Sequence, residues 1–439
     1  MVLKINSKNF YLNHCNEIDR YLNSNIKSLH LVNKLSDIVE NINVDKTLTV
    51  EFNNIDNVKN IANSNQYYDL IILTDLFEIS DDIYNFLIEI KKLLTNEGKI
   101  LITSINPKWN FVLKVFEKIR LKKYSENRNY INPIKINNIA KSAGLELVLS
   151  NSRQIIPFKF LGIGNLINQF LEIVFSYFRF GIQMYSMFRK VEIESSTKKK
   201  SIIVPAKNEE GNLEELIERI PNFNRDELEI IIICGPSKDQ TLEKAYEIKK
   251  NKDDIEIVVL EQKNNGKANA VFEGLDVSTG DLIAILDSDL SVDPETLIDF
   301  FKIVENGTAD FVNGTRLIYG KEKGSMRFLN NIGNVIFQFL ISLVIKQKLT
   351  DSLCGTKVFK RSYLEFLYRW RNSKKIKDPF GDFDFIFSAA FSGQKILEYP
   401  VHYRTRKYGK TQISRFKDGW KLFFYFISSY VKFHSSNKV

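Results

Sequence analysis

Glycine is missing from the first part of this 439-residue chain, in which Gly98 is the earliest glycine. Cysteine is scarce too: Cys15, Cys234 and Cys354 are widely spaced and odd in number, which argues against a disulfide framework and favours a reducing compartment. The opening stretch MVLKINSKNFYLNH has no apolar core, so we expect no secretory signal. Residues 155–191 are apolar and aromatic, but polar residues interrupt them. Because a membrane-crossing helix needs about 20 mainly apolar residues, we do not expect this stretch to cross a membrane.

The chain is basic and long enough for two folded domains. Its length exceeds what one ordinary core holds, and 44% of its residues are hydrophobic. A formal net charge of +9 predicts an anionic partner: a phosphorylated substrate, an acidic membrane surface or nucleic acid. No recognised nucleic-acid-binding module accompanies the basic residues, so we expect no nucleic acid partner.

Alternating strand and helix patterns predict an α/β protein. In the first domain, Tyr68–Thr74 has the composition of a buried strand, Ile83–Leu94 has helical periodicity, and Lys99–Thr103 is a further strand. The apolar stretch that follows is expected to form helices, which could be ordinary core or lie at an interface. The expected divisions are a first domain over 1–154, an apolar helical linker over 155–197, a second domain over 198–399 and a basic, amphipathic C-terminal segment over 400–439.

In the second domain, each predicted strand is followed by a polar loop. The strands are expected over 201–204, 228–233, 256–260 and 282–286. Open α/β sheets bind ligands at the carboxyl ends of their strands, so these loops should form one site. The last loop contains Asp287 and Asp289, whose i, i+2 spacing places both carboxylates on one side of the strand's end. Two such carboxylates suit Mg²⁺ or Mn²⁺, which complete their shells with water and phosphate oxygens. A solvated acidic turn is the alternative.

The motifs of the second domain carry a family resemblance. In order, they are VPAKNEE, SKDQT, NGKANAVFEGL, STGDLIAILDSDLSVDPE and FVNGTR. This series, from Lys198 to Phe416, resembles glycosyltransferase family 2, specifically the branch containing dolichyl-phosphate mannose synthase and other polyprenyl-phosphate glycosyltransferases. The resemblance implies a GT-A fold, a nucleotide-sugar donor and an inverting transfer.

The resemblance also implies roles for individual residues. The nucleotide sugar would be bound by Pro205, Lys207, Glu209, Lys267, Asp287, Ser288 and Arg316, and the divalent cation by Asp287 and Asp289. Arg316 suits its role because a planar guanidinium matches phosphate oxygens, although it could be a surface arginine. Where the family commonly has an acidic residue after the second strand, this chain has Cys234 and Gly235, which leaves the base of the nucleotide open.

On the acceptor side, the resemblance implies catalytic roles for Asp289, Asp382, Asp384 and Arg406. Asp382 and Asp384 occupy the place of a general base in members that use a hydroxyl acceptor. A lipid phosphate is already anionic, so both residues could instead orient substrate, or simply cap the helix that follows. Asp351–Gly355 (DSLCG) resembles the family's acceptor-side loop, and Arg406, Gly409 and Thr411 match the family's mobile loop.

The first domain resembles the later half of a class I methyltransferase domain, with Asp75 at the end of a strand. Such enzymes bind S-adenosylmethionine on a glycine-rich turn, because only glycine lets the backbone approach the ligand closely. With no glycine before Gly98, we expect an incomplete Rossmann-like domain that is catalytically silent and binds no S-adenosylmethionine.

Together these features predict a metal-dependent glycosyltransferase that moves a sugar from a nucleotide-diphosphate sugar to a polyprenyl phosphate. The aromatic and basic segment Trp420–Phe433 and a second apolar helix expected over Phe328–Ile345 favour attachment to an anionic membrane surface, with the protein cytoplasmic and peripheral at the cytoplasmic face. Either segment could instead be ordinary core or an oligomer contact. Two alternatives stay open: a saccharide or protein hydroxyl as acceptor, and a nucleotide-sugar-binding scaffold without turnover.

Overall fold

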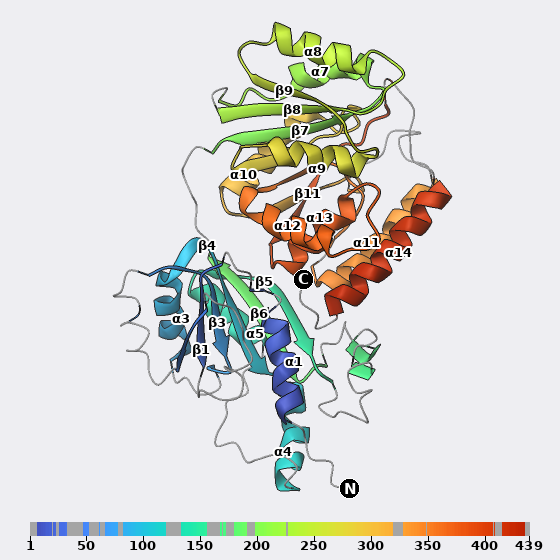
Figure 1. Ribbon diagram of the computed structural model, residues 1–439. Coiled ribbons are helices and arrows are strands. Elements are labelled where there is room, and N and C mark those ends of the chain that lie inside the picture. Colours follow the sequence, from blue (N-terminus) through green and yellow to red (C-terminus); the bar gives the residue numbers. More distant parts are fainter. Residues whose placement is uncertain are drawn as a thin grey trace. The chain divides into compact units, whose positions relative to one another are not determined.

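The computed structural model of the chain divides into two compact units (Figure 1). Unit 1 comprises Met1–Glu192 with Lys432–Val439, and unit 2 comprises Ile193–Val431. The structure describes residues 7–19, 21–22, 26–32, 47–51, 61, 66–77, 82–119, 133–155, 167–168, 170–172, 180–190, 198–224, 227–318, 328–347, 349–406, 408 and 415–434.

The described part of unit 1 contains a six-stranded sheet of order β2-β1-β3-β4-β6-β5. Strands β2, β1, β3 and β4 are parallel neighbours, whereas β6 runs antiparallel to both β4 and β5. The elements are α1 (Ser7–Asp19), β1 (Ser28–Val32), β2 (Thr47–Glu51), β3 (Tyr68–Thr74), α3 (Ile83–Lys92), β4 (Leu94–Ile105), the short 3-10 helix η2 (Pro107–Trp109), α4 (Asn110–Lys118), α5 (Pro133–Ser142), β5 (Leu145–Arg153) and β6 (Gln183–Lys190).

Helices cover both faces of this sheet. Successive residues of a strand point to opposite sides, so each strand contacts both layers of helices. In β3, Ile71 and Leu73 pack with residues of α3 and α5, whereas Leu70 and Ile72 pack with residues of α1. The near-continuous apolar sequence of β3 therefore reflects burial on both faces.

One part of the predicted helical linker is a strand instead. Gln183–Lys190 form β6, which pairs with β4 on one side and β5 on the other. Because both faces of the sheet are covered, the neighbours Met184 and Tyr185 are both buried, as are Met187 and Phe188. The run therefore lacks the alternation that identifies a half-buried strand in a sequence. Linker residues 156–166, 169, 173–179 and 191–197 lie outside the described part of the chain.

In unit 2 the described residues form a seven-stranded sheet of order β13-β11-β12-β10-β7-β8-β9. Strands β10, β7, β8 and β9 are parallel neighbours, and β12 runs antiparallel between β10 and β11. The first elements are β7 (Lys200–Ala206), α7 (Glu210–Arg219), β8 (Leu228–Cys234), α8 (Thr241–Asn251), β9 (Glu256–Glu261), α9 (Lys267–Val277) and β10 (Leu282–Ile285). They are followed by η6 (Pro294–Thr296), α10 (Leu297–Glu305), β11 (Phe311–Thr315), α11 (Phe328–Ile345), β12 (Lys357–Lys360), η7 (Arg361–Tyr363), α12 (Leu364–Asn372), α13 (Asp382–Phe391), β13 (Ile396–Pro400) and α14 (Arg415–His434), of which the residues up to Val431 belong to unit 2.

Strand alternation also sets the layers of unit 2. Ile202 and Ile232 belong to a core cluster with residues of α7, α8 and α10 on one face. On the other face, α9 lies so close to the sheet that a Cβ at Gly274 would come within 2.7 Å of Ile203 and Ile233. Both domains are therefore α/β, as predicted. Among helices in the described segments, none has the length and apolar character needed to cross a bilayer.

At the amino ends of these strands, Glu229 joins three segments of the sheet. This side chain is 2% exposed. It accepts hydrogen bonds from Ser201 Oγ at 2.5 Å, Thr279 N at 2.6 Å and Gly280 N at 3.1 Å. Burial by itself raises the pKa of the Glu229 carboxyl, but the hydrogen bonds from Ser201 and Thr279 hold the pKa below its ordinary value.

We predict that Glu229→Gln lowers the free energy of unfolding of unit 2 by about 1–3 kcal/mol at neutral pH, because an amide NH₂ would face backbone N–H donors. A depressed folded-state pKa gives stability that is present above the unfolded pKa and is lost as pH falls through the folded pKa. In denaturant unfolding, the two proteins should therefore converge below about pH 4. A difference that stays constant into acid would contradict this. Glu256→Gln is the control, since Glu256 is 55% exposed and pairs with Lys199 at the surface.

Candidate active site

Most of the predicted site residues, though not Asp384, gather where the strand order of unit 2 reverses. From β7 the chain continues to β8 and β9 on one side and then places β10 on the other side of β7. Ligands of open α/β sheets bind at the carboxyl ends of strands at such a reversal. The loops after β7 and β10 are joined there, because Ser288 Oγ donates to the Pro205 carbonyl oxygen at 2.9 Å.

Asp287 and Asp289 lie in a turn beyond β10, which ends at Ile285. The alternation of a strand therefore does not govern their direction, yet both reach the same edge of the sheet. Asp287 Oδ1 lies 2.5 Å from Lys267 Nζ, and Asp289 Oδ2 lies 2.7 Å from Arg406 Nη2. Each carboxylate of the predicted cation pair is thus matched by a basic side chain.

The surroundings of Asp287 favour its charged form. Burial raises the pKa of Asp287, but Lys267, with smaller contributions from Lys357 and Arg316, holds the pKa below its ordinary value. The backbone at Gly355 approaches this carboxylate closely, and a Cβ there would lie 2.1 Å from Asp287 Oδ2. Only glycine leaves room for the carboxylate in this position.

The loop after β7 brings Glu209 toward the same carboxylates. Glu209 N donates to Thr241 Oγ1 at 3.0 Å, and Asn212 Nδ2 donates to Glu209 Oε2 at 2.5 Å. Burial raises the pKa of Glu209 to about 7, with Asp289 and Asp287 adding to the rise while Asn212 and Arg406 oppose it. Lys207, in the same loop, lies against Gly235, where a Cβ would come 3.4 Å from Lys207 Cβ.

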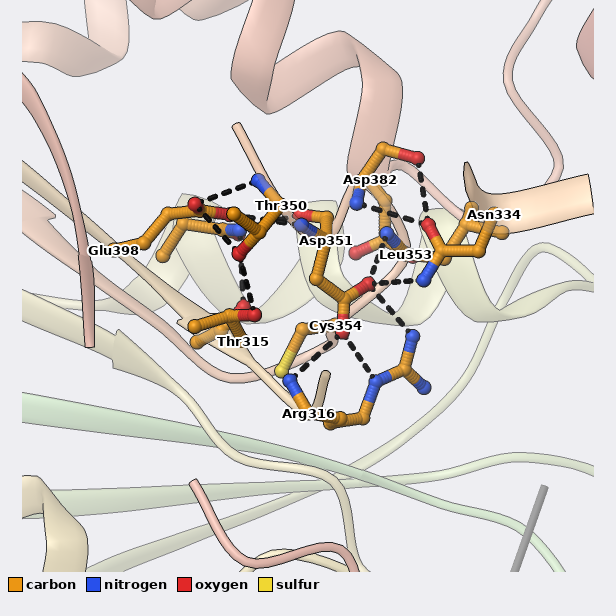
Figure 2. A network of polar contacts seen from close by, with 12 residues as sticks. Thr315, Arg316, Asn334, Thr350, Asp351, Leu353, Cys354, Asp382 and Glu398 are labelled. Carbon is orange, nitrogen blue, oxygen red and sulfur yellow. Dashed lines mark hydrogen bonds and ion pairs between the residues drawn. The ribbon is translucent and has the colours of Figure 1, made fainter. Parts of the chain in front are cut away.

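Arg316 is held by Asp351 in a two-pronged ion pair (Figure 2). Arg316 Nε lies 2.7 Å from Asp351 Oδ2 and Nη2 lies 2.9 Å from Oδ1, while the Arg316 backbone N–H donates to Oδ2. Burial raises the pKa of Asp351, but Arg316 outweighs burial and lowers the pKa. The edge of the guanidinium that carries Nη1 stays outside this ion pair.

Asp382 and Asp384 point to different partners. Asp382 Oδ1 lies 2.5 Å from Nζ of the buried Lys357. Asp382 also faces Lys267: burial lowers the pKa of that lysine, but Asp287 and Asp382 outweigh burial and raise it. Asp384 is fully buried and lies elsewhere, with Oδ2 2.8 Å from Arg371 Nη1 and Oδ1 accepting from the Tyr425 hydroxyl. The structure therefore brings Asp382, and not Asp384, to the other predicted site residues.

The helix cap considered for these two aspartates is supplied by Asp378. Its carboxylate accepts from the backbone N–H groups of Phe380, Phe383 and Asp384 at the start of α13. Burial, together with Asp384 and Asp382, raises the pKa of Asp378 to about 7. The sequence signal was the first aspartate of DPFGDFD, which precedes the helix by four residues.

The segment after β13 runs along the aspartate turn. Arg404 N donates to Ser291 O at 2.9 Å, and the Tyr403 ring lies 5.0 Å from the Arg316 guanidinium carbon. Tyr408 reaches α7, where a Cβ at Gly211 would come 2.9 Å from its ring. These contacts of Tyr403, Arg404 and Tyr408 hold the segment from which Arg406 reaches Asp289. Gly409 and Thr411 of the predicted loop motif lie outside the described residues.

Sequence reasoning gave no role to three residues that shape this site: Gly355, Asp351 and Lys357. The first two lie in the DSLCG segment, whose resemblance to an acceptor-side loop was the available signal. Lys357 is a fully buried lysine at the start of β12, and a lysine in a strand gives no such signal.

The donor set fits a divalent cation only together with a phosphate ligand. Within the described residues, no group of three or more His, Cys, Asp or Glu side chains is arranged to hold a metal. Asp287 and Asp289 supply carboxylate oxygens, and Mg²⁺ or Mn²⁺ bound through two carboxylates completes its shell with water and substrate phosphate. The two carboxylates fit that manner of binding.

In unit 1 the corresponding edge has a different character. Asp75 follows β3, as predicted, with a left-handed φ of 53°. Its Oδ1 accepts from Thr103 Oγ1 at 3.2 Å and from Gln183 Nε2 at 2.9 Å. The partners of this carboxylate are therefore neutral side chains of the same sheet.

Comparisons with known proteins agree with this division. Residues 201–367 match the family model "Glycosyl transferase family 2", and residues 17–150 match the model "Methyltransferase domain". The chain is 27% identical to the dolichol-phosphate mannosyltransferase of Pyrococcus furiosus over 49% of this chain and 59% of that protein. It is 28% identical to the dodecaprenyl-phosphate galacturonate synthase of Rhizobium johnstonii over 38% of this chain and 48% of that protein. The chain thus spans about half the length of these relatives.

Among solved structures, the mannosyltransferase PcManGT of Pyrobaculum calidifontis is similar with 19% identity and a TM-score of 0.38, over 62% of this chain and 73% of that one. Because this TM-score and identity are low, the structural similarity does not contribute to the assignment of the two domains, which rests on the sheet order and the family models. The chain therefore carries a glycosyl transferase family 2 domain over residues 201–367, preceded by a methyltransferase-like domain over residues 17–150.

Proposed function

We propose that this protein is an inverting, metal-dependent glycosyltransferase that moves a sugar from a nucleotide-diphosphate sugar to a polyprenyl phosphate. The observation that carries the proposal is the pair Asp287 and Asp289 at the strand reversal, with Lys267 and Arg406 bound to them. Carboxylates that lie next to lysine and arginine side chains suit a ligand that brings both a divalent cation and a diphosphate, because the carboxylates can bind the cation and the basic side chains can bind the phosphates. The names of the relatives, both polyprenyl-phosphate sugar transferases, support the acceptor class.

In the proposed reaction, an oxygen of the acceptor phosphate bonds to the anomeric carbon from the side opposite the departing diphosphate. The bond from that carbon to the diphosphate oxygen breaks, and its electrons leave with the diphosphate. A divalent cation held by Asp287 and Asp289 would stabilise the charge on the departing group. Lys267 and Arg406 can turn from the carboxylates to phosphate oxygens, because both side chains are about one-third exposed.

Asp382 suits an orienting role better than that of a general base. Its carboxylate is bound to Lys357, which is fully buried. Taking a proton would leave the lysine charge uncompensated in the interior, which costs several kcal/mol. A phosphate acceptor needs no base, whereas a hydroxyl acceptor does, so this ion pair favours the lipid phosphate. In this proposal Asp384 positions α13 through Arg371 and Tyr425 and does not touch substrate.

The proposal places unit 2 on an anionic lipid surface at the cytoplasmic face of a membrane. Helix α14 exposes Trp420, Phe424 and Val431 on one side, with exposed fractions of 62%, 53% and 55%. Helix α11 exposes Ile336 and Phe339 in the same way. Such rows suit helices that lie in the interface, and the net charge of +9 favours anionic lipid. The three cysteines are free thiols, which supports a reducing compartment.

For the methyltransferase-like domain we propose a structural or partner-binding role without S-adenosylmethionine. The neutral partners of Asp75 and the lack of glycine before Gly98 support this role.

The test of the function is release of nucleoside diphosphate by the purified protein in liposomes, with several nucleotide sugars, Mg²⁺ or Mn²⁺, and with or without polyprenyl phosphate. We expect release that requires both the metal and the lipid phosphate. Release with a saccharide or peptide hydroxyl instead would identify the other acceptor class. Saturable binding of a nucleotide sugar without any turnover would support the scaffold.

We predict that Asp289→Asn lowers kcat/KM by about a hundredfold or more, since a cation ligand and the partner of Arg406 are lost together. The measurement is metal-dependent transfer at saturating lipid phosphate. Asp253→Asn, which changes an exposed aspartate of unit 2, should match the unchanged protein. Full activity of Asp289→Asn would refute the metal assignment.

We also predict that Gly355→Ala lowers kcat/KM by at least about tenfold, because the new Cβ displaces the Asp287 carboxylate and a small misplacement of a catalytic group is costly. Gly419→Ala is the control, since a Cβ at this helical glycine meets nothing within 4 Å. That variant should retain activity and gain about 0.5–1 kcal/mol of stability. Equal activity of the two variants would argue against a fixed position for Asp287.

For the membrane surface, we predict that Phe339→Glu and Phe424→Glu each lower partitioning onto anionic vesicles by about tenfold or more. Each change removes one aromatic side chain that would be buried in the lipid. Sedimentation with vesicles measures this. Tyr246→Glu provides the matched control, since Tyr246 is an exposed aromatic residue on α8. If all three variants partition alike, α11 and α14 do not form the contact surface.

A further inference from the structure

The helices with exposed apolar rows also make specific contacts toward the interior of unit 2. On α11, Asn334 is 2% exposed, whereas its neighbours Val335 and Ile336 are 43% and 53% exposed. On α14, Tyr425 is buried between the exposed Phe424 and the buried Phe426. Each helix therefore has one side available to a surface and another side bound to residues near the site.

Asn334 joins α11 to the acceptor-side loop through both ends of its amide (Figure 2). Its Nδ2 donates to Asp351 Oδ1 at 2.7 Å. Its Oδ1 accepts from Ser352 N at 3.1 Å and from Ser352 Oγ at 3.0 Å. Asn334 thus shares the Asp351 carboxylate with Arg316.

The position of Asp351 in turn determines the position of Arg316. The Asp351 carboxylate accepts hydrogen bonds from Nε, Nη2 and the backbone N–H of Arg316. The backbone N–H of Asp351 donates to Glu398 Oε1 at 2.9 Å. Glu398 belongs to β13 and Arg316 follows β11, both of which are fixed in the sheet. Asn334 is the contact to Asp351 that comes from a helix with an exposed apolar row.

A second contact links the same two helices to the start of α13. The ring of Phe383 lies 5.3 Å from Phe337 of α11 and 6.2 Å from Tyr425 of α14, between ring centroids. Phe383 directly follows Asp382 in the chain. A shift of either helix would therefore reach residues on both sides of the candidate site.

We infer that Asn334 is a positioning residue through which contact of α11 with a lipid surface orients the Arg316 guanidinium. The inference rests on the proposed function. Burial of Val335, Ile336 and Phe339 in lipid would favour one placement of α11, and Asn334 transmits that placement to Asp351. A surface can shift such an equilibrium only through unequal affinity for the two placements, and the exposed apolar row supplies that inequality.

The consequence is that a lipid surface stimulates the chemistry itself and does not act only by presenting the acceptor. Empty vesicles should then raise transfer to an acceptor that stays in water. We expect anionic vesicles to raise kcat by at least about fivefold, with little change in KM for the acceptor.

The experiment uses the full chain, a short-chain isoprenyl phosphate that remains monomeric in solution, and acceptor-free anionic vesicles. Vesicle binding is measured in parallel by sedimentation. The ratio of kcat with vesicles to kcat without them is the readout, since a loss of stability alone would lower both rates and leave their ratio unchanged.

Three variants separate the contacts of α11. Asn334→Ala should bring the ratio close to one while vesicle binding persists. Asn334→Asp keeps an acceptor for Ser352 but places a carboxylate against Asp351, so it should lose stimulation at least as completely. Ser342→Ala, which removes the hydrogen bond from Leu349 N to the same helix, should keep the wild-type ratio.

The outcomes are distinct. Stimulation of the wild type that disappears in both Asn334 variants and persists in Ser342→Ala supports the inference. Transfer that vesicles do not stimulate, or equal stimulation of Asn334→Ala, overturns the inference and leaves the proposed function intact. Absence of transfer to any lipid phosphate overturns the proposed function and the inference with it.

Discussion

Repulsion among carboxylates gathered at one edge of a sheet is the constraint on which the second unit depends. A buried charge without a partner costs several kcal/mol, and four of the acidic side chains here are each matched with a basic side chain. The pairs are Lys267–Asp287, Arg406–Asp289, Arg316–Asp351 and Lys357–Asp382. Glu209 is bonded to the neutral Asn212 instead, and burial raises the pKa of its carboxyl to about 7.

The four ion pairs divide by exposure, and the division separates exchangeable partners from fixed ones. The Lys267 and Arg406 side chains are 32% and 30% exposed, so water can compensate them when they leave their carboxylates. Lys357 is fully buried and Arg316 is 12% exposed, and breaking their pairs would leave charges in the interior. In the proposed reaction the first two pairs give way to a cation and a diphosphate, while the other two pairs stay in place.

Local sequence patterns predicted the elements well because each pattern reports which faces of a segment are buried. Tyr68–Thr74 and Phe328–Ile345 have the bounds read from the sequence. Pairing between distant residues has no local signal, and Arg316 and Asp351 are 35 positions apart. Asp382 and Asp384 were treated alike although residues two apart on a helix point in different directions. That rotation sends Asp382 to Lys357 and Asp384 to Arg371 and Tyr425.

The two units have sheets of related order, yet the side chains described at their carboxyl edges differ. In both, four parallel neighbours are followed by an antiparallel strand. In unit 1, His30 Nε2 lies 2.8 Å from Thr74 Oγ1, and burial lowers the pKa of His30 to about 3, which keeps the imidazole neutral. Asp75 accepts hydrogen bonds from the Thr103 hydroxyl and the Gln183 amide. Among the described side chains at this edge of unit 1, hydrogen bonds to neutral groups take the place of ion pairs, whereas the described edge of unit 2 pairs its carboxylates with lysine and arginine side chains.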